Sequence, residues 1–461
     1  MNAITAAAVR AASAASAMHD TGLPIATRLG AFVADTSAAE LPASIVALAK
    51  DRLLDCLATG IAARKLAVPA VARAFCGDAR GPASLIGHDD RLPAEDAAFV
   101  NATLVNGCTH DDFLAKSHAG AVAVPAALAV GEAHGASGRE MLAAIVVGYD
   151  VCARAWLGGP DMLPRFRASG VAGAVGAAAA AARVEGLNAE QAANALGLAC
   201  MFASGFGAGF HAGTMDVKLN VGWAARSGVS AARLAACGAT SAPRVFEGPS
   251  GFFEAFANGA QHAAAAVHLL GERYLIEDTV YKERPVCIFV QTPVELAHRL
   301  VRDQGIAPAS IARVRIRAPL ATLTNPGYQN VAPFATQLQA RISARFTVAA
   351  TLLGRPVGSY KYFDQVDDAE VLALAERIEL LPPGESMQEV WVELQCSDGR
   401  SFDTRGFEMD HLTPTGEKTI AKYHRLTDGL PAAPVQRLFD TVMSLEHLAD
   451  VRALGAQLRA I

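Results

Sequence analysis

The sequence has little charge and few aromatic residues for its length. Of its 461 residues, 18% are charged and 6% aromatic, while 52% are hydrophobic. Lys and Arg number 40 against 45 Asp and Glu, a net charge of −5. Nucleic-acid binding needs concentrated basic side chains to displace counterions, and no segment here is persistently rich in Lys or Arg. The composition excludes a general nucleic-acid binder, and its apolar content excludes a disordered chain.

Paired cysteine motifs are also absent. The eight cysteines stand in apolar segments without Cys-x-x-Cys spacing, which excludes a zinc ribbon and the usual ligand pattern of an aconitase-type iron–sulfur cluster. We expect reduced thiols in the core of a cytoplasmic protein. They are Cys56, Cys76, Cys108, Cys152, Cys200, Cys237, Cys287 and Cys396.

No segment is typical of a membrane span or a targeting signal. The longest uncharged stretch, Gln191–Met215, contains Asn194, His211 and five glycines, so we expect a buried helix followed by a Gly-rich loop. The first 18 residues carry Arg10 as their only charge and are too rich in Ala and Ser for a signal sequence. We expect a flexible N-terminal extension over residues 1–22 and no membrane partner.

Alanine-rich segments with helical periodicity fill residues 23–272 and predict a domain of closely packed helices. Asn188 and Ser137 are predicted N-caps, and Gly186 is predicted to end a helix. The expected helices are Leu41–Ala63, Ala94–Gly107, Ala121–His134, Gly138–Trp156, Gly170–Val184, Asn188–Ala203 and Gly222–Cys237.

The pattern changes after about Tyr274. Residues 273–412 predict an α+β domain, and residues 413–461 a C-terminal helical segment that returns to the helical domain. The α+β domain is predicted from a strand with period-two alternation, a hairpin across an Asp-Gly turn and the helical segments between them. These are Ile311–Ala318, Glu389–Gln395 with Arg400–Thr404, Ile342–Leu353 and Asp368–Ile378, followed by Ala432–Leu458.

Two motifs resemble ligand sites by their letters. Gly207-Ala-Gly209 matches a dinucleotide fingerprint, but a helical segment precedes it where a strand is required, so we expect a loop there. Asp111 and Asp112, with His118 beyond them, suit a metal by residue type but lack its usual spacing. A polar loop between two helices is the competing interpretation, and loops concentrate functional groups.

Two lysines stand near changes of pattern. Lys218 follows the Gly-rich stretch and precedes an expected helix start at Gly222, and Lys282 lies where the α+β pattern begins. Such a lysine can act as a base or hold a carboxylate, and a solvated surface lysine fits the spacing equally well. The residues alone support a cofactor-free cytoplasmic enzyme with cationic groups near an interdomain cleft, without naming its reaction.

Taken in order, several segments resemble the MmgE/PrpD family, which includes 2-methylcitrate dehydratase, cis-aconitate decarboxylase and iminodisuccinate epimerase. The resemblance implies a mainly α fold with a smaller α+β lid, a homodimer, an active site between domain and lid, and chemistry without metal, flavin or nucleotide. The segments are Leu53–Gly60, Asn106–Gly107, Asp111–Asp112, His118–Gly120, Gly138–Tyr149, Gly170–Gly173, Gly222–Gly228, Glu247–Gly248, Gly251–Phe252, Lys282–Cys287 and Ala344–Ala350.

The family's functional positions are matched unevenly. His118 and Lys282 fall on the family's histidine and junction lysine, and Asp111 and Asp112 fall on its acidic pair. The chain departs elsewhere. Thr109 replaces an Asp, Phe113 replaces a Thr, Arg167 stands where a catalytic histidine often lies, Lys218 is one place from the expected lysine, and Asn220 replaces a histidine.

The resemblance implies a lyase of the 2-methylcitrate dehydratase type acting on a small di- or tricarboxylate. In this hypothesis His118 and Lys282 exchange protons, with Asp111 and Asp112 beside them. Arg167 and Lys218 hold carboxylates, with Arg165 and Asn220 as further binding residues. An Arg cannot act as a general acid near neutral pH, so two alternatives stay open. They are an epimerase of the iminodisuccinate type and a catalytically inactive carboxylate-binding homologue.

Overall fold

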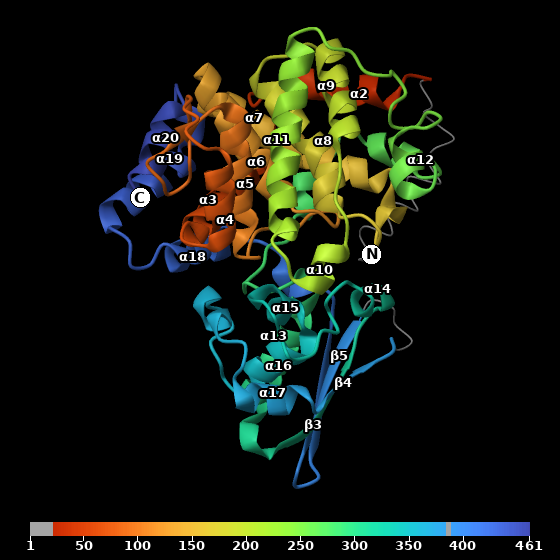
Figure 1. Ribbon diagram of the computed structural model, residues 1–461, viewed down its shortest axis with the longest axis vertical. Coiled ribbons are helices and arrows are strands. Elements are labelled where there is room, and N and C mark those ends of the chain that lie inside the picture. The colour runs from red at the N-terminus through yellow and green to blue at the C-terminus, as the bar shows by residue number, and fades with distance from the viewer. Residues whose placement is uncertain (1–21, 384–388) are drawn as a thin grey trace. The chain divides into compact units, whose positions relative to one another are not determined.

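The computed structural model describes residues 22–383 and 389–461. Of the extension predicted over residues 1–22, all but Gly22 lies outside the described residues. The described chain forms two compact units. The helical unit comprises residues 22–206, Lys218–Thr279 and Pro414–Ile461, and the α+β unit comprises Gly207–Val217 and Val280–Thr413. The chain is thus mainly α with a smaller α+β part, as the sequence predicted (Figure 1).

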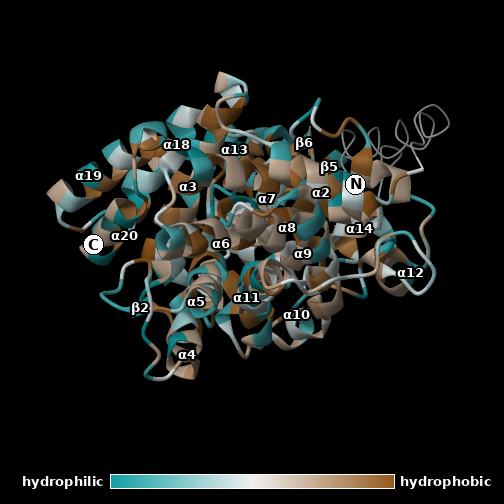
Figure 2. Cartoon of the chain, turned by 90° about the horizontal axis from the view of Figure 1, so that it is seen from above, coloured by the Kyte–Doolittle hydropathy of each residue, from teal (hydrophilic) through white to brown (hydrophobic). Residues whose placement is uncertain are grey.

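Small side chains let the central helices of the helical unit approach closely. A Cβ added at Gly148 of α7 would lie 2.7 Å from the Ala123 Cβ of α6 and 3.2 Å from the Gly176 carbonyl of α8. Figure 2 shows these helices mainly in the brown shades of apolar residues. The elements are α2 Ile25–Asp35, α3 Ala43–Ala63, α4 Ala67–Phe75, β1 Ala83–Ser84, β2 Arg91–Leu92, α5 Ala94–Gly107, α6 Ala119–His134, α7 Gly138–Leu157, α8 Ala168–Val184, α9 Ala189–Phe202, α11 Asp216–Ala236 and α12 Phe252–Ala257.

Both predicted N-caps are confirmed. Ser137 and Asn188 each form a capping box with the residue three places on, Glu140 and Gln191 respectively. The side chain satisfies a helix N–H, and the returning side chain satisfies the N–H of the cap.

The predicted helix start at Gly222 is wrong. Helix α11 begins at Asp216, where a carboxylate in the first turn complements the helix dipole, and the Thr214 hydroxyl donates to this carboxylate. Gly222 lies inside this helix. Glycine is needed at this position because a Cβ there would come 2.6 Å from the Phe99 carbonyl oxygen of α5. Lys218 and Asn220 are therefore helical residues and do not belong to a preceding loop.

The α+β unit contains a four-stranded sheet in the order β4-β3-β5-β6. Strand β3 pairs with β4 in parallel, the other neighbours are antiparallel, and the predicted hairpin is β5–β6. Helices α13 and α16 pack with this sheet. The elements are α10 Ala208–Ala212, α13 Ile288–Gln304, β3 Ile311–Arg317, α14 Leu320–Leu323, α15 Gln337–Ile342, α16 Ala344–Leu352, α17 Ala369–Ala375, β4 Ile378–Leu381, β5 Glu389–Cys396 and β6 Ser401–Phe407.

The Gly-rich stretch after α9 joins the α+β unit. The Thr336 hydroxyl donates to the Gly213 carbonyl at 3.0 Å, and Gly207-Ala-Gly209 opens the short helix α10. Helix α9 comes directly before this stretch, where a dinucleotide fingerprint requires a strand.

The C-terminal segment packs on α3. It forms α18 Gly416–Leu426, α19 Ala432–Met443 and α20 Arg452–Arg459, so the helical segment predicted over Ala432–Leu458 is divided between two α-helices. The break lets residues 445–448 dock on the start of α7, where the Gly138 N–H donates to the Leu448 carbonyl at 2.8 Å. None of the helices in the described residues is long and apolar enough to cross a bilayer.

The cysteine prediction holds in part. All eight thiols are free, as expected, but Cys237 is exposed and Cys76 and Cys287 are only half-buried. Apolar neighbours in the sequence do not decide which face of an element a side chain occupies.

Candidate active site

Three of the eight predicted site residues, Asp111, Asp112 and His118, lie on the loop between α5 and α6, residues 108–118. Thr109, His110, Asp111 and Asp112 are all at most 6% exposed. Leu114 and Ser117 exchange backbone hydrogen bonds at 2.9 and 2.8 Å, which closes a turn before His118. The polar-loop interpretation is therefore correct, although burial distinguishes this loop from an ordinary surface connection.

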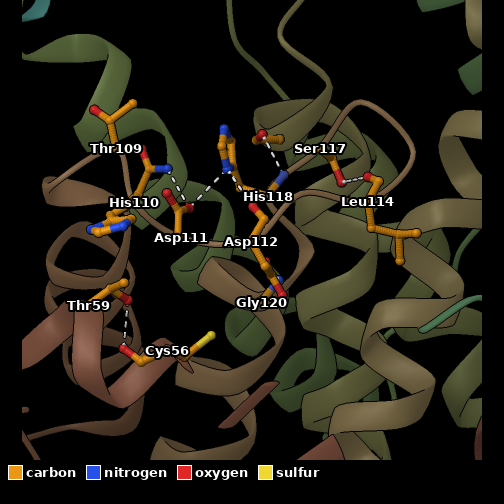
Figure 3. A network of polar contacts seen from close by, with 12 residues as sticks. Cys56, Thr59, Thr109, His110, Asp111, Asp112, Leu114, Ser117, His118 and Gly120 are labelled. Atoms are coloured by element: carbon orange, nitrogen blue, oxygen red, sulfur yellow. Dashed lines mark hydrogen bonds and ion pairs between the residues drawn. The ribbon is translucent and has the colours of Figure 1, made fainter. Parts of the chain in front are cut away.

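His118 and Asp111 form a close pair (Figure 3). The His118 Nδ1 lies 3.0 Å from the Asp111 Oδ2 and 3.0 Å from the Asp112 carbonyl oxygen. A carbonyl oxygen only accepts, so Nδ1 carries the proton, and in the neutral imidazole Nε2 then has the lone pair. Asn106 Nδ2 donates to the same Asp111 oxygen at 2.8 Å, and the Ser169 hydroxyl accepts from the His118 backbone N–H at 3.0 Å.

Asp112 points away from His118 into the helical core. Its carboxylate accepts from the Tyr149 hydroxyl at 2.5 Å and from the Gly120 N–H at 3.2 Å. Burial raises the pKa of Asp112 to about 7, while the positive charge of Arg52 acts in the opposite direction. Burial and the neighbouring Asp112 charge raise the pKa of Tyr149 well above its usual value, so this hydroxyl remains a donor.

Glycine at position 120 is required by this packing. A Cβ there would lie 2.2 Å from the Tyr149 hydroxyl oxygen and 2.8 Å from both carboxylate oxygens of Asp112. The start of α6 can approach the buried pair only without a side chain.

Two cationic side chains lie near this loop, Lys218 in direct contact with it and Arg167 through Asn106 of α5. Arg167, the N-cap of α8 and 6% exposed, donates from Nη2 to the Asn106 Oδ1 at 3.3 Å. Asn106 thus joins Arg167 to Asp111. Lys218, in the first turn of α11, donates from Nζ to the Thr109 hydroxyl at 2.9 Å. The structure therefore gathers Arg167, Lys218, Asp111 and His118 around one loop of the helical unit.

The other predicted residues lie elsewhere. Asn220 donates to the Ser204 carbonyl at 3.0 Å and packs over Gly170 and Gly205. Arg165 is exposed, donates to the Phe256 carbonyl at 3.4 Å and stands 5.5 Å from the Phe166 ring centroid. Its contacts do not join it to the cluster around His118.

Lys282 belongs to the α+β unit. It is 1% exposed and follows Tyr281, whose N–H donates to the Leu412 carbonyl at 3.3 Å. A solvated surface lysine, one of the interpretations that the sequence left open, is therefore wrong for Lys282, and at 7% exposure also for Lys218.

Sequence reasoning missed the charged residues behind the loop. Arg52 and Asp55 on α3 are at most 1% exposed, and Lys422 on α18 bonds both Asp55 and the His110 carbonyl. The sequence did contain a signal for Arg52 and Asp55, because both stand in or beside the apolar segment Leu53–Gly60 and charged residues are rarely buried without a partner. Lys422 gave no such signal, since α18 is rich in charge throughout.

The donor set suits proton transfer next to an anion. It offers a histidine with an oriented lone pair, a carboxylate that orients it and two cations for a substrate's negative charge. Within residues 22–383 and 389–461, no cluster of three or more His, Cys, Asp or Glu side chains has the geometry of a metal site.

Comparison with known families gives two matches along the chain. Residues 27–265 match the model of the MmgE/PrpD N-terminal domain, and residues 285–442 match that of the MmgE/PrpD C-terminal domain. The two matches include His118, Arg167 and Lys218 in the first and leave Lys282 just outside the second.

Similar proteins are named cis-aconitate decarboxylase. The chain is 27% identical to the Homo sapiens protein over 395 residues, covering 80% of each chain. It is 24% identical to an Aspergillus terreus protein over 410 residues, covering 81% of this chain and 83% of the other. A cis-aconitate decarboxylase-like protein of Aspergillus oryzae is 30% identical over 243 residues, half of each chain.

Proposed function

The chain belongs to the MmgE/PrpD family, and from this premise we propose that it is a cofactor-independent lyase of the 2-methylcitrate dehydratase type. The family comprises lyases and isomerases, and the chain is an enzyme of this kind. Its proposed substrate is a small di- or tricarboxylate. The observation that carries the proposal is the Asp111–His118 pair beside Arg167 and Lys218.

In the proposed reaction, His118 Nε2 removes a proton from the carbon next to a substrate carboxylate. Asp111 holds Nδ1–H and stabilises the imidazolium that forms, as a carboxylate does in other acid–base dyads. The electron pair left on carbon spreads into the adjacent carboxylate, and Arg167 and Lys218 lower the energy of that dianion. Loss of hydroxide from the neighbouring carbon, protonated as it leaves, gives the alkene and water.

Lys282 is the proposed second proton-transfer group. The support is the resemblance of its segment to the family's junction lysine together with its burial. Replacing Lys282 by Met tests this role, because Met retains the bulk of the side chain without an exchangeable proton. A variant that turns over substrate as fast as the wild type would remove Lys282 from the mechanism.

Proton NMR in D₂O with EDTA identifies the reaction. The protein is incubated separately with 2-methylcitrate, citrate, cis-aconitate and iminodisuccinate. A new vinyl signal from citrate, or a new singlet of a methyl group on an alkene carbon from 2-methylcitrate, supports the dehydratase. Loss of CO₂ from cis-aconitate indicates the activity for which the relatives are named. Deuterium entry without loss of water or CO₂ indicates the epimerase. A raised melting temperature without turnover indicates a binding homologue, since a ligand of the native state stabilises it.

The homodimer and the cytoplasmic location stay predictions. Sedimentation of the purified chain tests the first, and cell fractionation tests the second.

A further inference from the structure

A lysine from the C-terminal segment contacts the backbone of the 108–118 loop. The Lys422 Nζ donates to the His110 carbonyl at 2.6 Å and lies 2.6 Å from the Asp55 Oδ1. Both side chains of this ion pair are 1% exposed. One ammonium group thus connects three elements of the helical unit: α18, α3 and the loop.

The hydrogen bond from Lys422 matters because the His110 carbonyl lies directly before Asp111 in the chain. His110 lies between Thr109, whose φ is 58°, and Asp111. A left-handed residue interrupts the regular backbone pattern, so the carbonyl beside it needs a donor from elsewhere, and Lys422 supplies one. Fixing the plane of the peptide bond between His110 and Asp111 fixes the start of the Asp111 side chain.

Asp111 in turn orients His118. Its Oδ2 accepts from the imidazole at 3.0 Å and from Asn106 at 2.8 Å. A shift of the Asp111 backbone therefore turns the imidazole away from its line to the substrate. Effects of this kind are large, because a misplacement of about 1 Å at a reacting group costs about 100-fold in rate.

We propose that Lys422 is a positioning residue that sets the direction of the His118 imidazole through the His110 carbonyl. This role rests on the proposed function, in which His118 moves the proton. An apolar side chain at position 422 would fill the same space but would not donate a hydrogen bond to the His110 carbonyl. The charge is expensive to bury, and Asp55 offsets that cost.

The chain contains a matched control in Lys50. Its Nζ lies 2.9 Å from the Met443 carbonyl and 2.9 Å from the Glu446 carboxylate, so it also joins α3 to the C-terminal segment through one carbonyl and one carboxylate. Neither partner belongs to the 108–118 loop. Lys50→Met therefore removes a similar connection without moving the His110 carbonyl.

Three variants separate positioning from stability. Lys422→Met leaves the Asp55 charge buried, so we expect a lower melting temperature and a kcat reduced about 100-fold with KM changed less than about threefold. The double variant Asp55→Asn with Lys422→Met removes that charge and regains most of the melting temperature, because no Asp55 carboxylate is then buried without the Lys422 ammonium. Its kcat stays low. Lys50→Met retains the wild-type kcat.

Two kinetic outcomes overturn the proposal. One is a double variant whose kcat returns together with its melting temperature, since Lys422 would then be purely structural. The other is a Lys422→Met enzyme with wild-type kcat.

NMR of protein with ¹⁵N-labelled histidine decides the same question without a substrate. The His118 signal is assigned by its loss in His118→Gln. We expect its Nδ1–H resonance to shift in Lys422→Met and in the double variant and to stay in place in Lys50→Met. An unchanged resonance in Lys422→Met overturns the positioning role. A wild type that turns over no carboxylate instead counts against the proposed function, and the resonance still decides the role of Lys422.

Discussion

The Thr109 hydroxyl accepts a hydrogen bond from the Lys218 Nζ at 2.9 Å, and it does so from a backbone with a φ of 58°. A β-branched residue is unfavourable in that left-handed region, where Asn and Asp are better tolerated. The resemblance of the sequence to the family implies an Asp at this place. The chain therefore retains a neutral group beside Lys218 at a cost in backbone energy.

Replacing Thr109 by Asp places a negative charge beside Lys218. We expect KM for the carboxylate substrate to rise about tenfold, because the new carboxylate competes with the substrate for the lysine. Thr109→Asn is the matched control, since it suits the same backbone without the charge and leaves KM near the wild-type value. Steady-state kinetics of the two variants checks this, and equal KM values would contradict it.

Replacing His118 by Gln removes the proposed base. We expect kcat to fall by about 10³-fold with little change in the melting temperature, because general acid–base catalysis contributes about 10²–10⁴-fold and the side chain is 15% exposed. Asp111→Asn is expected to lower kcat by at least about 100-fold, since an amide does not stabilise the imidazolium as a carboxylate does. Stopped assays with the NMR-identified substrate measure both effects.

His134→Gln serves as the control for these two variants. His134 is exposed and lies in the last turn of α6, the helix that follows His118. A loss of activity in this control equal to that of His118→Gln would show that the assay reports damage to α6 and not loss of the base.

Replacing Asp112 by Asn tests the buried carboxylate through pH. The folded-state pKa of Asp112 is raised to about 7 from an ordinary value of 3.8. Its contribution to stability is therefore fully present below about pH 4 and is lost as the pH rises towards 7. We expect the free energy of unfolding of Asp112→Asn, relative to the wild type, to increase by up to about 4 kcal/mol between pH 4 and pH 8.

Urea unfolding at the two pH values measures this difference. The exposed Asp78 provides the control, because Asp78→Asn removes a carboxylate without a buried environment. A relative stability of Asp112→Asn that stays constant with pH would show that Asp112 titrates as an ordinary carboxylate.

Replacing Gly120 by Ala forces a methyl group between Tyr149 and Asp112. We expect a loss of about 3 kcal/mol in the free energy of unfolding, from overpacking and from the displaced hydrogen bond. Gly358→Ala is the control, because a Cβ at Gly358 has nothing within 4 Å. Thermal or urea unfolding measures the stability of both variants. Equal stabilities would contradict the prediction and would show that α6 moves aside to make room for the methyl group.

The sequence by itself determined most of the secondary structure. The predicted helix Ala94–Gly107 matches α5, and the predicted hairpin is β5–β6, because caps, a turn motif and local periodicity carry this information. Prediction from the sequence failed where the role of a residue depends on packing against a distant segment. Gly222 was interpreted as a helix start, whereas it is a close contact with Phe99 inside α11.

The residues of the 108–118 loop were also found from the sequence, since polar letters between two apolar helices stand out. Their arrangement was not. Asn106 joins Arg167 to Asp111, whereas Arg165 donates to the Phe256 carbonyl, although the resemblance implied a binding role for both arginines. A one-dimensional pattern records which groups are available but not the direction of their side chains.

Only the tertiary structure connected Lys422 with His110, which lies 312 residues earlier. Periodicity and capping act over a few residues, whereas this bond exists because α18 packs on α3 behind the loop. The chemistry available to the protein is thus determined by the sequence. The orientation of His118 and the charges that surround Asp112 are decided by packing between segments far apart in the chain.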